Sequence, residues 1–356
     1  MNYHLFGESH GPAIGVVLED VPAGIELDMA FVAAQMARRA PGGSLLATAR
    51  READAVEIVS GVFEGRTCGT PLCAIIRNTD MRSRDYEATR WLARPGHADW
   101  TGHLRYAGCN DPRGGGHFSG RLTAPLVFAG AVARLALRGH GIEIAAHIRE
   151  LAGLTDSPVD YANPDLAALR ALPQKDLAVL DDAAGEAMRE RIVQARACGD
   201  SVGGVIECLV CGMPAGLGGP DFDDSVESLW ARYLLAIPAV KGLEFGAGFR
   251  LAAMRGSEAN DPFYRDSEGR IRTRTNNNGG INGGITNGMP LVCAVAIKPT
   301  PSIALEQETV DMRTGESARL RVGGRHDPCI LPRAVPVVEA ATALTMQSLL
   351  ACGARS

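Results

Sequence analysis

The sequence repeats part of itself, and this repeat limits the folds that the chain can adopt. Residues 7–25 read GESHGPAIGVVLEDVPAGI and residues 199–217 read GDSVGGVIECLVCGMPAGL, and the two stretches align without a gap. Each copy is expected to form a glycine-rich turn, an apolar strand and a Pro-Ala-Gly turn. Chance recurrence of glycine, proline and valine in strand–turn units is the alternative, but the ungapped match favours an ancient duplication.

A second and a third pair of segments follow in the same order. Residues 65–72 (GRTCGTPL) resemble residues 284–291 (GITNGMPL), and both run into apolar strands. The weaker third pair consists of helices that begin near Pro125 and Pro336, each after a Gly-Gly stretch with histidine and arginine.

The duplication predicts a single domain, residues 1–356, whose pseudo-repeat halves cover about residues 1–150 and 199–350. The halves differ at one position of chemical interest, because His10 in the first copy aligns with Val202 in the second. A histidine in only one of two similar halves is what a site added to a repeated scaffold would show.

Six stretches have the composition and end signals of helices. Asp28 is an expected N-cap for the first, Thr123 for the second, and Pro336 falls in the first turn of the last. Residues 152–182 and 255–275 are polar and predict surface excursions, and no glycine motif predicts a Rossmann fold. The predicted helices are residues 28–39, 123–138, 163–171, 183–197, 223–235 and 334–350.

Composition argues against several classes of function. A net charge of -5 gives no bulk basicity for nucleic acid, and 5% aromatic residues leave few stacking platforms for single strands. No signal peptide and no run of roughly 18 apolar residues is visible, so we expect a cytoplasmic protein. Cys208 and Cys211 lie in an alternating pattern typical of a strand, and the histidines lack metal-ligand spacing, so no metal is predicted.

Five polar, glycine-rich turns are the candidate functional segments. Glycines let backbone N–H groups approach a ligand, and arginine forks match phosphate and carboxylate, so the turns predict a site for a small anion. His10 and His97 lie in such turns, whereas His103, His140 and His147 are predicted to have structural roles. The turns are residues 6–12, 94–99, 111–121, 276–288 and 323–329.

The motifs in these turns resemble those of the chorismate synthase family. The matching segments are FGESHGPAIGVVLEDVPAGI, RPGHAD, RGGG, GGINGGITNG, KPTPSI and RHDPCILPRAVPVVEA, in family order from residue 6 to about residue 340. The resemblance implies an α+β fold, a β-α-β sandwich, that forms a homotetramer. It also implies a carbon–oxygen lyase that converts 5-enolpyruvylshikimate 3-phosphate to chorismate by anti-1,4-elimination of phosphate. A non-catalytic flavin- or phosphometabolite-binding relative is the alternative.

The resemblance further implies a cofactor and roles for residues. The cofactor is reduced FMN from an external reductant, since no segment resembles a flavin reductase domain. His10 is expected to set the protonation state of the flavin, His97 to donate a proton to the departing phosphate, and Asp327 to assist removal of the C–H proton. Substrate-binding residues are expected to be Arg39, Arg94, Arg121 and Arg325. Flavin-binding residues are expected to be His117, Phe118, Ser119, Gly283, Lys298, Pro299, Thr300, Pro301, Ser302 and Arg325.

The sequence departs from the family pattern at three places. Residues 117–123 read HFSGRLT where the family commonly has RSSARET, so an arginine and an acid are missing. Leu45 stands where a basic residue is common, and Pro238 where asparagine is frequent. We interpret these differences as the signature of a subgroup, because the three expected catalytic residues are present. Without the resemblance, Asp327 could also be explained as part of an Asx-turn.

Overall fold

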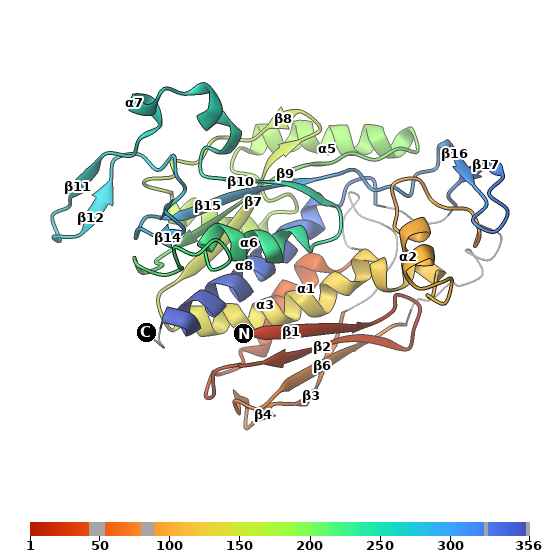
Figure 1. Cartoon of the computed structure of the whole chain (residues 1–356), viewed down its shortest axis with the longest axis horizontal. Helices are drawn as coiled ribbons and strands as arrows, with labels where there is room; N and C mark the ends of the chain where they lie inside the picture. Colours follow the sequence, from red (N-terminus) through yellow and green to blue (C-terminus); the bar gives the residue numbers. More distant parts are fainter. Residues whose placement is uncertain (43–53, 80–88, 324–326, 354–356) are drawn as a thin grey trace.

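The structure, a computed structural model, describes residues 1–42, 54–79, 89–323 and 327–353. These residues form three layers, in which helices lie between two antiparallel sheets (Figure 1). The arrangement confirms the predicted α+β class and the β-α-β sandwich.

The first sheet lies at the bottom of Figure 1 and holds the first sequence copy. Its strands alternate between buried and more exposed positions, as expected for a sheet with one face on the core. Leu72, Ala74 and Ile76 are buried, for example, whereas the residues between them are less so. The strand order is β1 (Asn2–Gly7), β2 (Ala13–Glu19), β6 (Leu72–Arg77) and β3 (Val56–Ser60).

The second sheet covers the opposite side of the helices. Its central strands are buried along most of their length, and Cys208 of one strand pairs with Cys293 of the next, which confirms the strand predicted around Cys208 and Cys211. The strand order is β10 (Val240–Phe245), β15 (Leu291–Ile297), β9 (Gly204–Cys211), β7 (Glu143–Leu151) and β8 (Leu154–Thr155).

The middle layer contains α1 (Met29–Arg39), α3 (Thr123–Arg138) and α8 (Leu331–Gly353). Helices α3 and α8 are apolar on nearly every side, as expected for helices enclosed by other elements. They cross so closely that a Cβ atom on Gly130 would lie 2.2 Å from the Cβ of Ala340. Both helices begin at the same end of the layer, beside the carboxyl end of α1.

The two halves of the chain repeat one strand succession. The order β2-β6-β3 in the first sheet corresponds to β9-β15-β10 in the second. The Pro-Ala-Gly turns are also held alike, because Thr67 Oγ1 donates to Pro22 O at 2.6 Å and Thr286 Oγ1 donates to Pro214 O at 2.7 Å. This geometry agrees with the duplication that we propose for the two halves.

Shorter elements connect these layers. Those that carry site residues or support them include α2, the 3₁₀ helices η2 and η3, and two short hairpins. Their bounds are α2 (Asp99–Arg105), η2 (Arg113–Phe118), η3 (Gly120–Leu122), β4 (Val62–Phe63), β5 (Arg66–Thr67), β13 (Ile281–Asn282) and β14 (Ile285–Thr286). The others are α4 (Leu166–Ala171), η4 (Leu172–Gln174), α5 (Asp182–Ala197), α6 (Val226–Leu235), η5 (Gly248–Ala253), α7 (Gly256–Ala259), β11 (Phe263–Arg265), β12 (Ile271–Thr273), β16 (Glu306–Val310) and β17 (Ser317–Arg321).

Some helix ends differ from the prediction. Asp28 caps α1 as expected, accepting from Phe31 N at 2.9 Å, but Thr123 is the first residue of α3 and its hydroxyl donates to Gly120 O instead. Helix α8 begins at Leu331, which places Pro336 inside it. The buried contact of α8 with α3 extends the helix beyond the point that local signals mark, since tertiary packing overrides propensity.

Two predictions need correction: that residues 152–182 lie on the surface, and that the chain has no long apolar run. The segment 152–182 is not only a surface excursion, because Leu172 and Leu177 are buried in the core. By length and composition, residues 120–138 and 331–353 could each cross a membrane, although no such run was predicted. Most of each helix is buried inside the protein, as core helices are.

The predicted structural role of His147 is confirmed. Its ring is fully buried between Asp156 Oδ2, 3.0 Å from Nδ1, and Glu207 Oε1, 3.1 Å from Nε2. Burial alone would lower the pKa of His147, but the two carboxylates outweigh it and the pKa is raised. His147 thus joins β7, β9 and the chain after β8.

Candidate functional site

The glycine run Gly114–Gly116 in η2 brings the two predicted catalytic histidines together. All three glycines have positive φ angles, of 60°, 87° and 53°, which side chains rarely allow. A Cβ atom on Gly114 would lie 2.5 Å from His10 Nε2, and one on Gly115 would lie 3.1 Å from His97 Nε2. Only residues without side chains therefore fit here, and the two imidazoles face adjacent positions of one loop.

The turn that carries His10 is fixed from two sides. Ser9 N donates to Gly116 O at 3.1 Å, and Asn78 Nδ2 donates to Gly11 O at 2.8 Å. His10 is buried, with 6% of its surface exposed. The hydroxyl of Ser9 is also buried and has no hydrogen-bond partner among the residues that the structure describes.

His97 belongs to a charged group with Arg94 and Asp99. Asp99 Oδ1 lies 2.7 Å from His97 Nδ1, and the same carboxylate accepts two bonds of 2.7 Å from the Arg94 guanidinium. Burial would raise the pKa of Asp99, but Arg94 and His97 hold it well below its usual range. A carboxylate at Nδ1 fixes the tautomer of the ring and leaves Nε2 for the space beside Gly115.

Asp99 was not predicted as a site residue, although it is the last residue of the RPGHAD motif. An acid two residues after a histidine in a glycine–proline turn could therefore have indicated Asp99. Arg94 was predicted to bind substrate, but its Nε and Nη2 atoms are bound to Asp99, so its clearest contact is within the protein.

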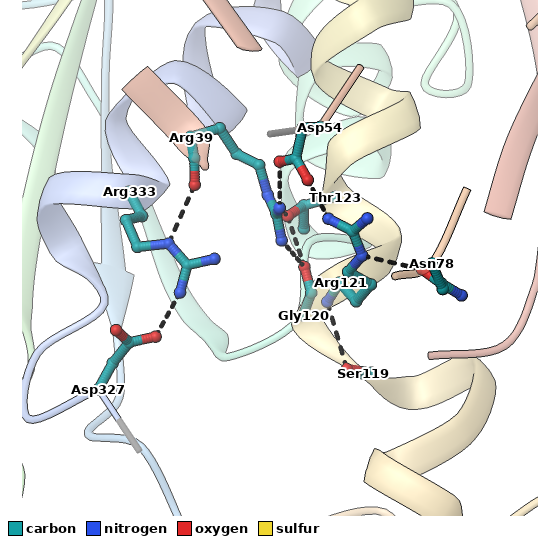
Figure 2. A network of polar contacts seen from close by, with 9 residues as sticks. All are labelled: Arg39, Asp54, Asn78, Ser119, Gly120, Arg121, Thr123, Asp327 and Arg333. Atoms are coloured by element: carbon teal, nitrogen blue, oxygen red, sulfur yellow. Dashed lines mark hydrogen bonds and ion pairs between the residues drawn. The ribbon is translucent and has the colours of Figure 1, made fainter. Parts of the chain in front are cut away.

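Two further expected substrate arginines meet a buried aspartate (Figure 2). Arg39 Nη1 lies 2.6 Å from Asp54 Oδ2, and Arg121 Nη1 pairs with Asp54 Oδ1. The arginines are 2% and 4% exposed. Burial, together with the nearby Arg333, lowers the pKa of Arg39 to about 10 against the opposing effect of Asp54, so the guanidinium stays charged at neutral pH. Sequence reasoning missed Asp54, which lies in no recognisable motif.

Asp327 joins the same network from the segment just before α8 (Figure 2). Its carboxylate pairs with Arg333, whose Nε donates to the backbone oxygen of Arg39 at 3.0 Å. Asp327 thus lies at the amino end of α8, while Arg121 lies at the amino end of α3. The positive ends of two helix dipoles therefore point to this region, which favours an anion.

The segment Lys298–Ser302 lies against the turn of His97. Lys298 Nζ donates to Gly96 O, and a Cβ atom on Gly96 would lie 3.4 Å from Pro301 Cβ. The hydroxyl of Thr300 is buried without a hydrogen-bond partner in the part of the chain that the structure describes. Ser302 is also buried. These expected flavin-binding residues are thus brought to the turn that carries His97.

Residues 117–119, which were expected to bind flavin, face different surroundings. His117 is exposed, with Nδ1 3.0 Å from Gly7 O, and Ser119 accepts from the backbone N–H of Arg121. Phe118 turns to α2, where its ring fills the space above Gly102 and lies 6.3 Å from that of Tyr106. Phe118 therefore packs as an apolar anchor of α2.

Gly283 is not brought to the other expected residues within one chain. It lies in the turn between β13 and β14, and this hairpin contacts Leu217, which also touches Gly353 at the carboxyl end of α8. Asp327 precedes the amino end of that helix, and its 23 residues span about 35 Å at 1.5 Å per residue. Arg325 and Leu45 lie outside the described residues.

Comparison with known proteins identifies the family. The family model described as chorismate synthase matches residues 1–350. A chorismate synthase of Dehalococcoides mccartyi is 47% identical over 97% of this chain and 93% of its own length. One of Thermococcus gammatolerans is 49% identical over 97% of this chain and 94% of its own.

A solved structure supports the same assignment. A crystal structure of chorismate synthase superposes with a TM-score of 0.77 and 28% identity, covering 99% of this chain and 92% of the other. The predicted lyase of aromatic biosynthesis is confirmed by these matches, and the non-catalytic alternative gains no support from them. The glycine loop with its two histidines thus belongs to a known enzyme fold, and the chain is a member of the chorismate synthase family.

Proposed function

We propose that the chain converts 5-enolpyruvylshikimate 3-phosphate to chorismate with reduced FMN, in the cytoplasm and as a homotetramer that depends on an external reductant. The observation that carries the proposal is the approach of His10 and His97 to successive glycines of one loop. The loop leads into α3, whose amino end favours the anionic substrate.

The residues around the loop fit a flavin. Two buried hydroxyls, Ser9 Oγ and Thr300 Oγ1, have no hydrogen-bond partner among the described residues, and a polar ligand would satisfy them. The glycines leave a surface without side chains, and Lys298 adds positive charge beside it. Ser9, Gly114–Gly116 and residues 298–302 would hold the cofactor, which when bound supplies electron density to the reacting substrate.

His97 is the proposed proton donor to the leaving phosphate. Imidazole holds and releases protons near neutral pH, and Asp99 orients the ring through its contact with Nδ1. Arg94 in turn holds Asp99 through two side-chain bonds and one from its backbone N–H at 3.0 Å. In this proposal Asp99 and Arg94 are positioning residues, and the proton on His97 Nε2 is the one transferred.

The charged network of Figure 2 is the proposed anion-binding wall. Three arginines, Arg39, Arg121 and Arg333, outnumber Asp54 and Asp327, so the region keeps positive charge. The substrate carries one phosphate and two carboxylates, and guanidinium groups match both. We propose that Asp327, oriented by Arg333, assists removal of the C–H proton.

The test is an anaerobic assay with 5-enolpyruvylshikimate 3-phosphate and photoreduced FMN that follows chorismate absorbance. We expect His97→Ala to lower kcat by ~10²-fold or more. Asp99→Asn is expected to lower kcat with little change in KM, since the ring loses the carboxylate that orients it while the substrate contacts remain. The matched control is His140→Ala, which changes an exposed histidine at the far end of α3.

The outcomes separate the proposal from its alternative. If the unchanged protein binds FMN tightly but forms no chorismate, the non-catalytic alternative is favoured. Normal turnover of His97→Ala would remove the proton-donor role. If Asp99→Asn raises KM as much as it lowers kcat, Asp99 has only a structural role.

A further inference from the structure

A cavity lies at the opposite end of α3 from the histidines. It has a volume of about 800 Å³, is open on one side, and is lined by residues of α1, the carboxyl end of α3, α4 and the start of β7. The 16 residues of α3 separate its two ends by about 24 Å. Its volume is within the range of small-molecule sites.

The walls of this cavity combine apolar and cationic side chains. Phe31, Leu137, Ile142 and Leu169 are among the apolar residues. The charged residues are Arg38, Arg134, Arg138 and Arg170 against Glu143 and Glu339, so positive charge is in excess.

Three of the four arginines are bound within the protein. Arg38 and Arg134 clamp the buried carboxylate of Glu339, with Nη1–Oε2 distances of 2.5 and 2.7 Å. Arg170 makes two bonds of 2.7 and 2.5 Å to Glu143. Both acidic residues of the cavity wall, Glu143 and Glu339, are therefore already paired with arginines.

Arg138 differs from the other three. Among the residues that the structure describes, its guanidinium has neither a hydrogen-bond partner nor an ion pair. It stacks on the ring of Phe31, with Cζ 3.7 Å from the centroid. Arg134 lies one helical turn away, and like charges at this spacing repel. Burial and then Arg134 lower the pKa of Arg138, while Asp28 and Glu143 act in the opposite direction.

We propose that this cavity binds a small aromatic carboxylate, whose carboxylate group pairs with Arg138 and whose ring lies on the apolar wall beside Phe31. A guanidinium fork held over an aromatic ring, as Arg138 is over Phe31, can pair with a planar carboxylate. The apolar walls favour an organic body over inorganic phosphate, which would leave them uncovered. The site is separate from that of the elimination reaction.

The experiment is isothermal titration calorimetry of the whole protein with benzoate, with benzyl alcohol and inorganic phosphate as comparison ligands. We expect saturable benzoate binding, and at least 10-fold weaker binding by both comparison ligands. Arg138→Gln is expected to weaken benzoate binding at least 10-fold. Its matched control is Arg196→Gln, in the last turn of the equally long α5, which is expected to change nothing.

Circular dichroism and chorismate formation verify that both variants remain folded. His97→Ala is measured in parallel, since benzoate could also enter the catalytic site. The proposal is overturned if benzoate does not saturate the protein, as when a second copy covers the cavity, or if Arg138→Gln binds it normally. It is also overturned if phosphate or benzyl alcohol binds equally well, or if His97→Ala abolishes binding.

Discussion

The close crossing of α3 and α8 makes Gly130 a demanding position. An added Cβ would lie 2.2 Å from the Cβ and 2.3 Å from the Cα of Ala340. Because carbon atoms normally pack about 3.5–4.0 Å apart, the helices would have to separate by more than 1 Å or so. The neighbouring atoms belong to backbone or to a methyl group, so no flexible side chain can turn aside.

Two opposing effects set the size of the change in Gly130→Ala. Alanine is favoured over glycine inside a helix by about 1 kcal/mol, whereas overpacking a tight core costs about 1–3 kcal/mol. The contact with Ala340 cannot be relieved by rotating a side chain, so we use the upper part of the overpacking range. The net loss of unfolding free energy is expected to be about 1–2 kcal/mol.

Urea denaturation followed by circular dichroism measures this loss, and the chorismate assay measures the effect on the site. Both helices carry site residues at their amino ends, so kcat is expected to fall together with stability. Gly256→Ala is the control, because it starts a helix and an added Cβ would meet nothing within 4 Å. An unchanged or higher urea midpoint for Gly130→Ala would refute the argument.

Three further predictions concern other parts of the chain. Asp54→Asn leaves two buried guanidiniums without their carboxylate and is expected to cost about 3–5 kcal/mol in urea denaturation; a loss below 0.5 kcal/mol or so would contradict this. Gly115→Ala places a methyl group against the ring of His97 at a φ of 87°, and is expected to lower kcat by about 10- to 100-fold with a smaller effect on the urea midpoint. The raised pKa of His147 stabilises the fold below about pH 6.5, and that contribution is lost as pH rises through the folded-state pKa. The stability difference between the wild type and His147→Gln is therefore expected to shrink between pH 6 and pH 9, and a constant difference would argue against a charged ring.

Local patterns in the sequence predicted single strands and the histidine pair, whereas the layered sandwich was implied by the family resemblance. Alternating apolar residues and glycine turns identified β6, β9 and β15, and the setting of His10 and His97 marked them for function. Asp54 could not be found in this way, since its role arises from two arginines that approach it from α1 and η3. Burial of such charges depends on tertiary contacts that no local pattern records.

The positions of helix ends and of Gly283 show the same limit. Pro336 marks a helix start locally, but packing between α3 and α8 carries the helix further back to Leu331. The family motif implies that Gly283 contacts the flavin, but the motif does not indicate where the β13–β14 hairpin lies in the fold. Phe118 was expected to contact the flavin and Arg94 the substrate. The structure shows further contacts that the motifs did not indicate, of Phe118 with Gly102 and of Arg94 with Asp99.

The parallel pairing of α3 and α8 divides the chemistry between the two parts of the chain. His10 and His97 come from the part before α3, whereas Lys298 and Asp327 come from the part before α8. Neither part alone supplies all residues of the proposed site, so a substitution in one part affects what the other part must provide. Compensating changes during evolution are therefore expected to occur in pairs across this helix contact rather than along either part.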